Sequence, residues 1–519
     1  MKKFWKICGL FFLLAAFLGG AFVAYKKFFP SQNISLEMVE DIKDSVKDSI
    51  SDLVDECETS WNIVENIKNK FLNLFYKKEH YLNIFIHGNF NTGLGMLSLP
   101  NVLKDDIKGT SYIKLVRRLR KDPFFYQEQP ILSRGLTSID PTYDVSSINS
   151  EFKYAAYPII AGYQDVYNSV YANNKKEINH FYTFGWSGIL SQSKRIIEAV
   201  RFYNALAEEV EKFRRNGIDA KVKIVAHSHG GNISINLGLV HEALKRVKDK
   251  NAKIEGLELN ANPELLEYFN RMVSYLESLP SKRFAKKQKG LHKFDYIPSK
   301  KGLKIEELII TGTPVQAENS FFINSEIFKK AYSFYSEQDI VQFMDIFTTK
   351  HYSGQRFNFK SDESFKPKVV QVRMLIDRDL EILAKEKSDK SWWNKLSLDR
   401  IFAKERKEPT HKDLWFFAWN KEYSQPNFPL KPLPLVIIFP FLIQILDNNP
   451  EFKDVDLDLF FEKTKIKAWL LKHDEEKRID EAFLPNTIIE DIKKKVAPWE
   501  PDDLYRYNTY KRLQSSLND

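Results

Sequence analysis

The stretch that most constrains the fold runs from Lys221 to Ile235, with the sequence KVKIVAHSHGGNISI. The β-branched run Val222–Val225 predicts a buried strand, and the apolar helical pattern that closes the stretch predicts a helix. Ser228 stands at the turn between them. Ala226 and Gly230, two places away on either side, fit the G-x-S-x-G pattern with one alanine substitution. Small residues are needed there because larger side chains would collide with the backbone of the strained turn.

Other apolar runs predict further strands, and a helical pattern covers residues 192–214. These runs are Tyr81–Ile86, His180–Phe184, Glu306–Ile310, Ala331–Tyr335 and Pro367–Ile376. Strands that alternate with helices indicate an α/β domain with a mainly parallel sheet. Ligands bind such sheets beyond the carboxyl ends of the strands. The polar or aromatic residues that follow predicted strands, and so mark the candidate site, are His87, Trp186, Ser228, Thr313 and Asp339.

A serine at such a turn suggests nucleophilic catalysis, which requires a histidine base oriented by a carboxylate. Two histidines after Ser228 fit the base. His411, in PTHKDLW, follows the last predicted strand at what we expect to be the start of a helix, whereas His351 precedes that strand. We favour His411 and keep His351 as the alternative.

Asp339 is the preferred acid because it follows the strand before the last one. Asp377, which closes the last strand, is the second choice, and Asp345 is the third. An oxyanion formed during acyl transfer needs two backbone donors. We expect these to be the N–H groups of His229 and Asn89, with Phe90 the neighbour to consider in place of Asn89.

In this order, six segments resemble those of bacterial lipase-like α/β-hydrolases, over about residues 80–425. They are IFIHGN, FGWSG, AHSHGGN, IITGTPVQ, YSEQDIVQ and PTHKDLW. The resemblance implies an α/β-hydrolase fold and an esterase or lipase that acts through an acyl-enzyme, without a metal or organic cofactor. Carried over to this chain, it makes Ser228 the nucleophile, Asp339 the acid and His411 the base. The lipid or acyl-ester substrate rests on this resemblance, on aromatic insertions and on the N-terminal segment described below.

The same residues leave other functions open. A thioesterase or an acyltransferase would use the same three side chains. The competing class is a non-catalytic surface or scaffold protein that keeps the fold. The net charge of +9 reflects many lysines, but we find no nucleic-acid module. The histidines are scattered and the only cysteines are Cys8 and Cys57, so no metal cluster or disulfide framework is expected.

The N-terminal segment predicts attachment to a membrane. The apolar run Ile7–Tyr25 approaches the length of a membrane-spanning helix, and lysines precede it. Residues 31–60 are strongly acidic, which favours a cytoplasmic N-terminus and an extracytoplasmic body. The alternative is a cleaved signal peptide.

The chain therefore divides into four predicted parts. Residues 1–30 form the anchor or signal, and 31–79 an amphipathic helical stalk, or else a helix packed on the body. Residues 80–425 form the α/β domain, with helical insertions at about 95–178 and 247–304. Residues 426–519 form a helical extension, in which the apolar segment 433–446 is a buried or interfacial helix too short to span a bilayer.

Overall fold

A computed structural model describes fourteen ranges of the chain. They are residues 78–88, 135–142, 156–171, 177–189, 191–250, 252, 263–285, 292–299, 303–339, 353–357, 368–376, 408–418, 428–472 and 478–500. The chain separates into two compact units, residues 1–75 and 76–519. All described residues belong to the second. The predicted anchor and nearly all of the predicted stalk lie outside the described residues.

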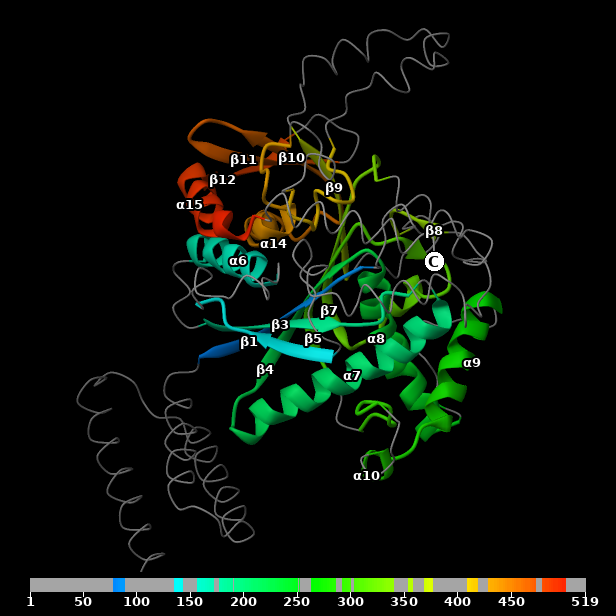
Figure 1. Ribbon diagram of the computed structural model, residues 1–519. Coiled ribbons are helices and arrows are strands. Elements are labelled where there is room, and N and C mark those ends of the chain that lie inside the picture. The colour runs from blue at the N-terminus through cyan, green and yellow to red at the C-terminus, as the bar shows by residue number, and fades with distance from the viewer. Residues whose placement is uncertain are drawn as a thin grey trace, which may run out of the picture. The chain divides into compact units, whose positions relative to one another are not determined.

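A 10-stranded sheet organises the second unit (Figure 1). Its seven central strands pair in parallel, in the order β10 (Asp454–Phe461), β9 (Val369–Ile376), β7 (Phe328–Tyr335), β5 (Ile305–Thr311), β4 (Ala220–His227), β1 (Glu79–Ile86) and β3 (Glu177–Gly185). Antiparallel pairing adds β11 (Lys465–Lys472) and β12 (Arg478–Pro485) at one edge and β2 (Gly135–Ile139) at the other. The predicted mixed α/β architecture with a largely parallel sheet is confirmed.

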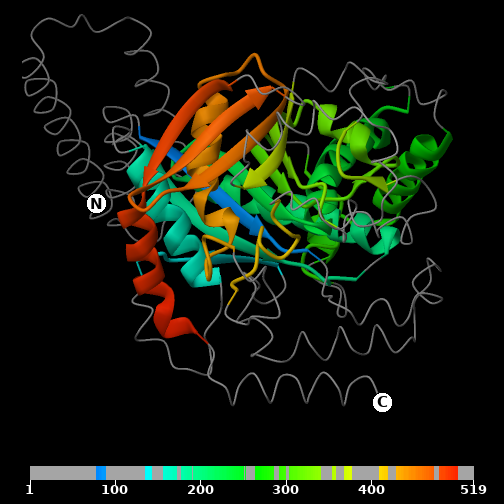
Figure 2. The same ribbon diagram turned by 90° about the horizontal axis from the view of Figure 1, so that it is seen from above.

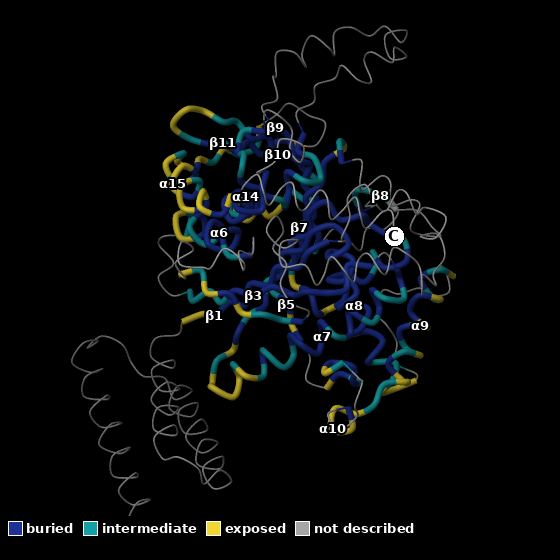
Figure 3. Tube along the Cα trace, in the orientation of Figure 1, coloured by how far each residue is buried: buried dark blue, intermediate teal, exposed yellow. Residues whose placement is uncertain are grey.

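Helices cover both faces of the sheet. One core forms with α7 (Gln192–Arg215), α8 (His229–Lys248) and α9 (Pro263–Ser278), and the other with α6 (Ala156–Val170), α14 (Phe439–Asp447) and α15 (Asn486–Val496). Strand β1 serves both, because successive side chains point to opposite faces: Leu82, Ile84 and Ile86 enter the first core and Phe85 the second. The central strands are mostly buried, most completely toward their carboxyl ends in β1, β3, β4 and β7, and exposed residues gather on outer elements such as α10 and α15 (Figure 3). Burial on both faces explains the continuous apolar runs.

Shorter elements complete the described structure. They are helix α10 (Lys282–Ala285), the two-stranded sheet of β6 (Val315–Gln316) and β8 (Ser353–Gly354), and the 3-10 turns Ser320–Asn324, Leu435–Ile438 and Ala497–Trp499. Within the predicted insertion at 95–178, β2 is a strand of the main sheet rather than a helix. None of the helices in the described ranges has both the length and the apolar character needed to cross a bilayer.

The prediction of a helical extension over 426–519 is wrong where the chain forms three strands, which continue the main sheet at one end (Figure 2). They are β10 (Asp454–Phe461), β11 (Lys465–Lys472) and β12 (Arg478–Pro485). In β10, DVDLDLFF, apolar residues alternate with Asp456 and Asp458, and both aspartates are fully buried. This alternation of acidic and apolar residues is the two-residue period that marks a strand, so the sequence did carry the signal for β10. The prediction of a buried helix within 433–446 is confirmed by α14.

Candidate active site

Ser228 lies at the junction of β4 and α8, as the strand–turn–helix pattern predicted. Its φ of 52° and ψ of −133° are unusual, and no other non-glycine residue in the described ranges has a positive φ. Such a conformation costs about 1–3 kcal/mol and must be held by its surroundings. The Ser228 N–H donates to the carbonyl of Thr311 on β5 (2.9 Å), and its carbonyl accepts from the Gly231 N–H (2.9 Å). The side chain makes no capping hydrogen bond to α8.

Two glycines allow the backbone to approach Ser228 closely. A Cβ atom on Gly230 would lie 2.4 Å from the carbonyl oxygen of His87, which confirms that this position must be small. A Cβ atom on Gly88 would lie 2.6 Å from Ser228 Cβ and 3.2 Å from its hydroxyl oxygen. The end of β1 therefore lies directly against the serine side chain.

The structure brings Asp339 and His411 together. His411 Nδ1 lies 2.7 Å from Asp339 Oδ2, with the carboxylate fully buried and the imidazole 11% exposed. A carboxylate accepts, so Nδ1 carries the hydrogen and Nε2 keeps its lone pair in the neutral ring. An aspartate after β7 thus sets the tautomer of a histidine 72 residues further along the chain.

His411 lies in a turn rather than at the start of a helix as expected. The backbone N–H and hydroxyl of Thr410 both donate to Asp413 Oδ2, at 2.8 and 2.7 Å, and close this turn. The N–H of Leu435 donates to the Asp413 carbonyl (2.9 Å), which ties the turn to the segment leading into α14. These contacts have the pattern of a capping box, which begins a helical turn, but the turn is not continued into a helix.

His227 connects the serine to the acid–base pair. Its ring lies 4.4 Å from the His411 ring and stacks on Trp415 at 5.3 Å, centroid to centroid. His227 Nε2 lies 3.2 Å from the carbonyl oxygen of His411, which can only accept, so Nε2 is the donor. Burial, and then the nearby charge of His411, lowers the pKa of His227 well below its usual value. A buried histidine directly before Ser228 thus supports, through its Nε2–H, the turn that carries His411.

On the other side of Ser228, the end of β1 is fixed to the loop after β3. The indole Nε1–H of Trp186 donates to the His87 carbonyl (2.7 Å), and the Trp186 backbone N–H donates to His87 Nε2 (3.2 Å). His87 Nδ1 then donates to the Gly88 carbonyl (2.6 Å). Both residues are fully buried. The predicted convergence of His87 and Trp186 with Ser228 therefore extends to direct hydrogen bonds around Gly88.

Of the two predicted oxyanion donors, only His229 belongs to the described residues. It is the first residue of α8, where backbone N–H groups and the helix dipole favour negative charge. Its ring contacts Asn232, whose amide donates to His229 Nδ1 (3.2 Å). Asn89 and Phe90 lie outside the described residues, as do His351, Asp345 and Asp377, the other candidates for base and acid.

Sequence reasoning missed several residues that hold this site: His227, Arg373 and Glu408. His227 is the last residue of β4 and directly precedes the predicted serine, and this position was the available signal. No local pattern marks the other two, because their contacts join distant parts of the chain. Within the described ranges, no group of three or more His, Cys, Asp or Glu side chains is arranged to hold a metal ion.

Comparison of the chain with protein-family models, with curated proteins and with solved structures found no match.

Proposed function

We propose that this protein is a serine hydrolase of the α/β-hydrolase fold that cleaves carboxylic esters. Ser228 is the nucleophile, His411 the base and Asp339 the acid. The observation that carries the proposal is the 2.7 Å contact between His411 Nδ1 and Asp339 Oδ2. The His411 ring lies beside that of His227, the residue directly before Ser228, whose backbone is strained. The order serine, acid, histidine along the chain is the one this fold uses.

The chemistry follows from these positions. His411 Nε2 removes the proton from the Ser228 hydroxyl as its oxygen bonds to the ester carbonyl carbon. The same proton then passes to the departing alkoxide when the carbon–oxygen bond of the ester breaks, which leaves an acyl-enzyme. Water, deprotonated by His411, attacks the acyl carbon and releases the carboxylic acid and the free serine. Asp339 stabilises the imidazolium formed in each step.

The negative charge that develops on the carbonyl oxygen needs donors already in place. We assign these to the N–H groups of His229 and Asn89. Each donor of this kind contributes about 3 kcal/mol to stabilisation of the transition state. The His229 N–H lies at the N-terminus of α8, where the positive end of the helix dipole further stabilises the negative charge.

The proposed substrate is a lipid or another acyl ester, and the proposed location is a membrane surface outside the cytoplasm. The N-terminal apolar run would hold the chain there, as an uncleaved anchor. The proposed hydrolysis needs no metal or organic cofactor, because the three side chains supply the nucleophile, the base and the counter-charge.

Labelling with a fluorophosphonate probe tests the proposal. The phosphorus atom is attacked by an activated serine, so the wild-type protein should become covalently labelled and Ser228→Ala should not. Ser187→Ala, which alters another buried serine near the same sheet edge, is the matched control and should label normally. Equal labelling of wild type and Ser228→Ala would refute the assignment of the nucleophile. A folded wild-type protein that does not label would favour the scaffold alternative.

A further inference from the structure

Glu408 is a fully buried carboxylate three residues before His411. Its Oε1 atom accepts two hydrogen bonds from the Arg373 guanidinium, at 2.8 Å from Nη2 and 3.2 Å from Nε. Its Oε2 atom accepts from the Glu337 backbone N–H at 2.6 Å and from the Ser336 hydroxyl at 3.2 Å. Glu408 thus contacts the turn that carries Asp339 with one oxygen and strand β9 with the other.

The Asp339 turn itself is compact around Ser336. The Asp339 N–H donates to the Ser336 carbonyl at 3.2 Å, and the Gln338 N–H donates to the Ser336 hydroxyl at 3.2 Å. The side-chain amide of Gln355 also donates to the Ser336 carbonyl at 2.9 Å. A displacement of Ser336 is therefore transmitted to Asp339.

Arg373 supplies the positive charge that faces the Glu408 carboxylate in the interior. It is 5% exposed, and its Nη2 also lies 2.8 Å from Glu337 Oε2. On the neighbouring strand β10, Asp456 is its register partner. Burial alone would lower the pKa of Arg373, but these acidic neighbours, Glu408 foremost, raise it. Hydrogen bonds from a guanidinium and from a backbone N–H hold a buried carboxylate in one orientation, because each bond fixes an angle as well as a distance.

We propose that Glu408 is a positioning residue, which joins the loop bearing His411 to the turn bearing Asp339 and so sets the geometry between base and acid. This inference rests on the proposed function. Glu408 has no part in proton transfer itself. It restricts two segments that also meet at the His411–Asp339 contact, and misplacement of catalytic groups by about 1 Å costs about a hundredfold in rate.

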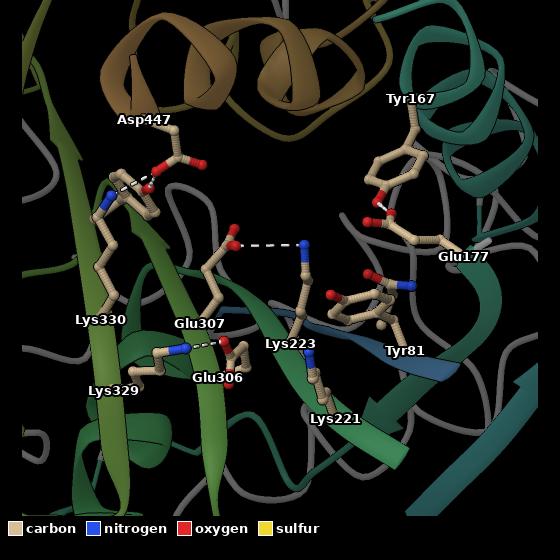
Figure 4. A network of polar contacts seen from close by, with 12 residues as sticks. Tyr81, Tyr167, Glu177, Lys221, Lys223, Glu306, Glu307, Lys329, Lys330 and Asp447 are labelled. Atoms are coloured by element: carbon tan, nitrogen blue, oxygen red, sulfur yellow. Dashed lines mark hydrogen bonds and ion pairs between the residues drawn. The ribbon is translucent and has the colours of Figure 1, made fainter. Parts of the chain in front are cut away.

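The test removes both charges together. Arg373→Met with Glu408→Met replaces the ion pair by apolar side chains of similar length, so that neither partner of this pair is left as an unpaired buried charge. The matched control is Lys223→Met with Glu307→Met. This ion pair, at 3.4 Å, joins the neighbouring strands β4 and β5 (Figure 4), and Lys223 precedes Ser228 by five residues.

The readouts are the final labelled fraction, the labelling rate and the pH at which that rate is half-maximal. We expect the Arg373/Glu408 variant to reach the wild-type labelled fraction about ten- to a hundredfold more slowly. Its half-maximal rate should move to lower pH, because a less firmly held carboxylate stabilises the protonated base less well. The Lys223/Glu307 variant should match the wild type in rate and pH profile. A purely structural role for Glu408 would reduce the labelled fraction and leave the rate and pH profile of the folded molecules unchanged.

Glu408→Gln provides a second variant if the double replacement does not fold. It retains the shape and one acceptor oxygen, and it should label more slowly than the wild type with the same shift in pH profile. A wild-type rate and pH profile in either folded variant would overturn the positioning role while leaving the proposed function intact. Absence of labelling in the wild type would overturn the proposed function, and this inference with it.

Discussion

The imidazole rings of His227 and His411 lie 4.4 Å apart, although 184 residues separate them in the chain. The hydrogen bond between these residues does not join the two rings, because His227 Nε2 donates to the backbone carbonyl of His411. The residue before the candidate nucleophile thus supports the backbone of the candidate base. The end of strand β4 thereby leads directly into the candidate nucleophile, Ser228, and also helps to position the candidate base, His411.

Asp339→Asn should abolish most of the reactivity of Ser228 while leaving the fold intact. An asparagine presents an N–H in place of one carboxylate oxygen, so it can hold His411 in the wrong tautomer and gives no counter-charge to the imidazolium. Loss of this acid in a comparable triad costs about 10⁴-fold. The measurement is the rate of fluorophosphonate labelling. Asp140→Asn, an exposed turn residue, is the control; an Asp339→Asn protein that labelled as fast as this control would exclude Asp339 as the acid.

Gly88→Ala should impair labelling more than stability. The new methyl group would lie 2.6 Å from Ser228 Cβ, so the serine or the end of β1 must shift. A displacement of about 1 Å at a nucleophile lowers the rate by about a hundredfold. The rate of labelling and the melting temperature, measured together, distinguish the two effects. Unchanged labelling would mean that the Gly88 backbone can retreat without moving the serine.

His227→Phe should change how stability depends on pH. Burial lowers the pKa of His227 in the folded state, so the unfolded chain binds a proton at pH values where the folded chain does not. The free energy of unfolding therefore falls as the pH drops below the unfolded pKa of about 6.5, by about 1.4 kcal/mol per pH unit for this one group. Phenylalanine keeps the stacking and removes the titration.

Urea unfolding of the wild type and of His227→Phe between pH 8 and pH 5 tests this. His80 and His180, whose pKa values are also lowered by burial, contribute equally to both proteins. The difference in unfolding free energy between the two proteins should hence shift in favour of His227→Phe below about pH 6.5. A difference that stays constant across this range would show that His227 does not resist protonation in the folded state.

A chain that ends at residue 425 should not fold. It lacks β10, which pairs in parallel with β9, and it lacks α14 and α15, whose apolar residues fill one of the two cores. The unpaired edge and exposed core would favour aggregation. A chain that ends at residue 500 keeps every described element and is the matched control. Cooperative thermal unfolding of the shorter chain would show that it folds without residues 426–519, and that these residues are a separate extension.

Local patterns were sufficient for six of the seven parallel strands and for the turn at Ser228, because a buried strand leaves a continuous apolar run and the helix after it leaves a period. Chain order then suggested Asp339 and His411, which the fold places in contact. The link between Glu408 and Arg373 left no such trace, since a buried glutamate and a surface glutamate look alike in a sequence. Strand β10 does show the two-residue alternation of a strand, and only the burial of Asp456 and Asp458 on its acidic face leaves no trace in the sequence.

The pairing of Asp456 with Arg373 has a consequence for the order in which the molecule is made. Ser228, its strand and its helix come from one contiguous stretch and can form early in synthesis. The counter-charges around Arg373 are not complete until β10 has been translated and has joined β9. A growing chain therefore has the turn at Ser228 before the contacts around Arg373 are complete, and under the proposed function its reactivity would begin only when β10 joins the sheet.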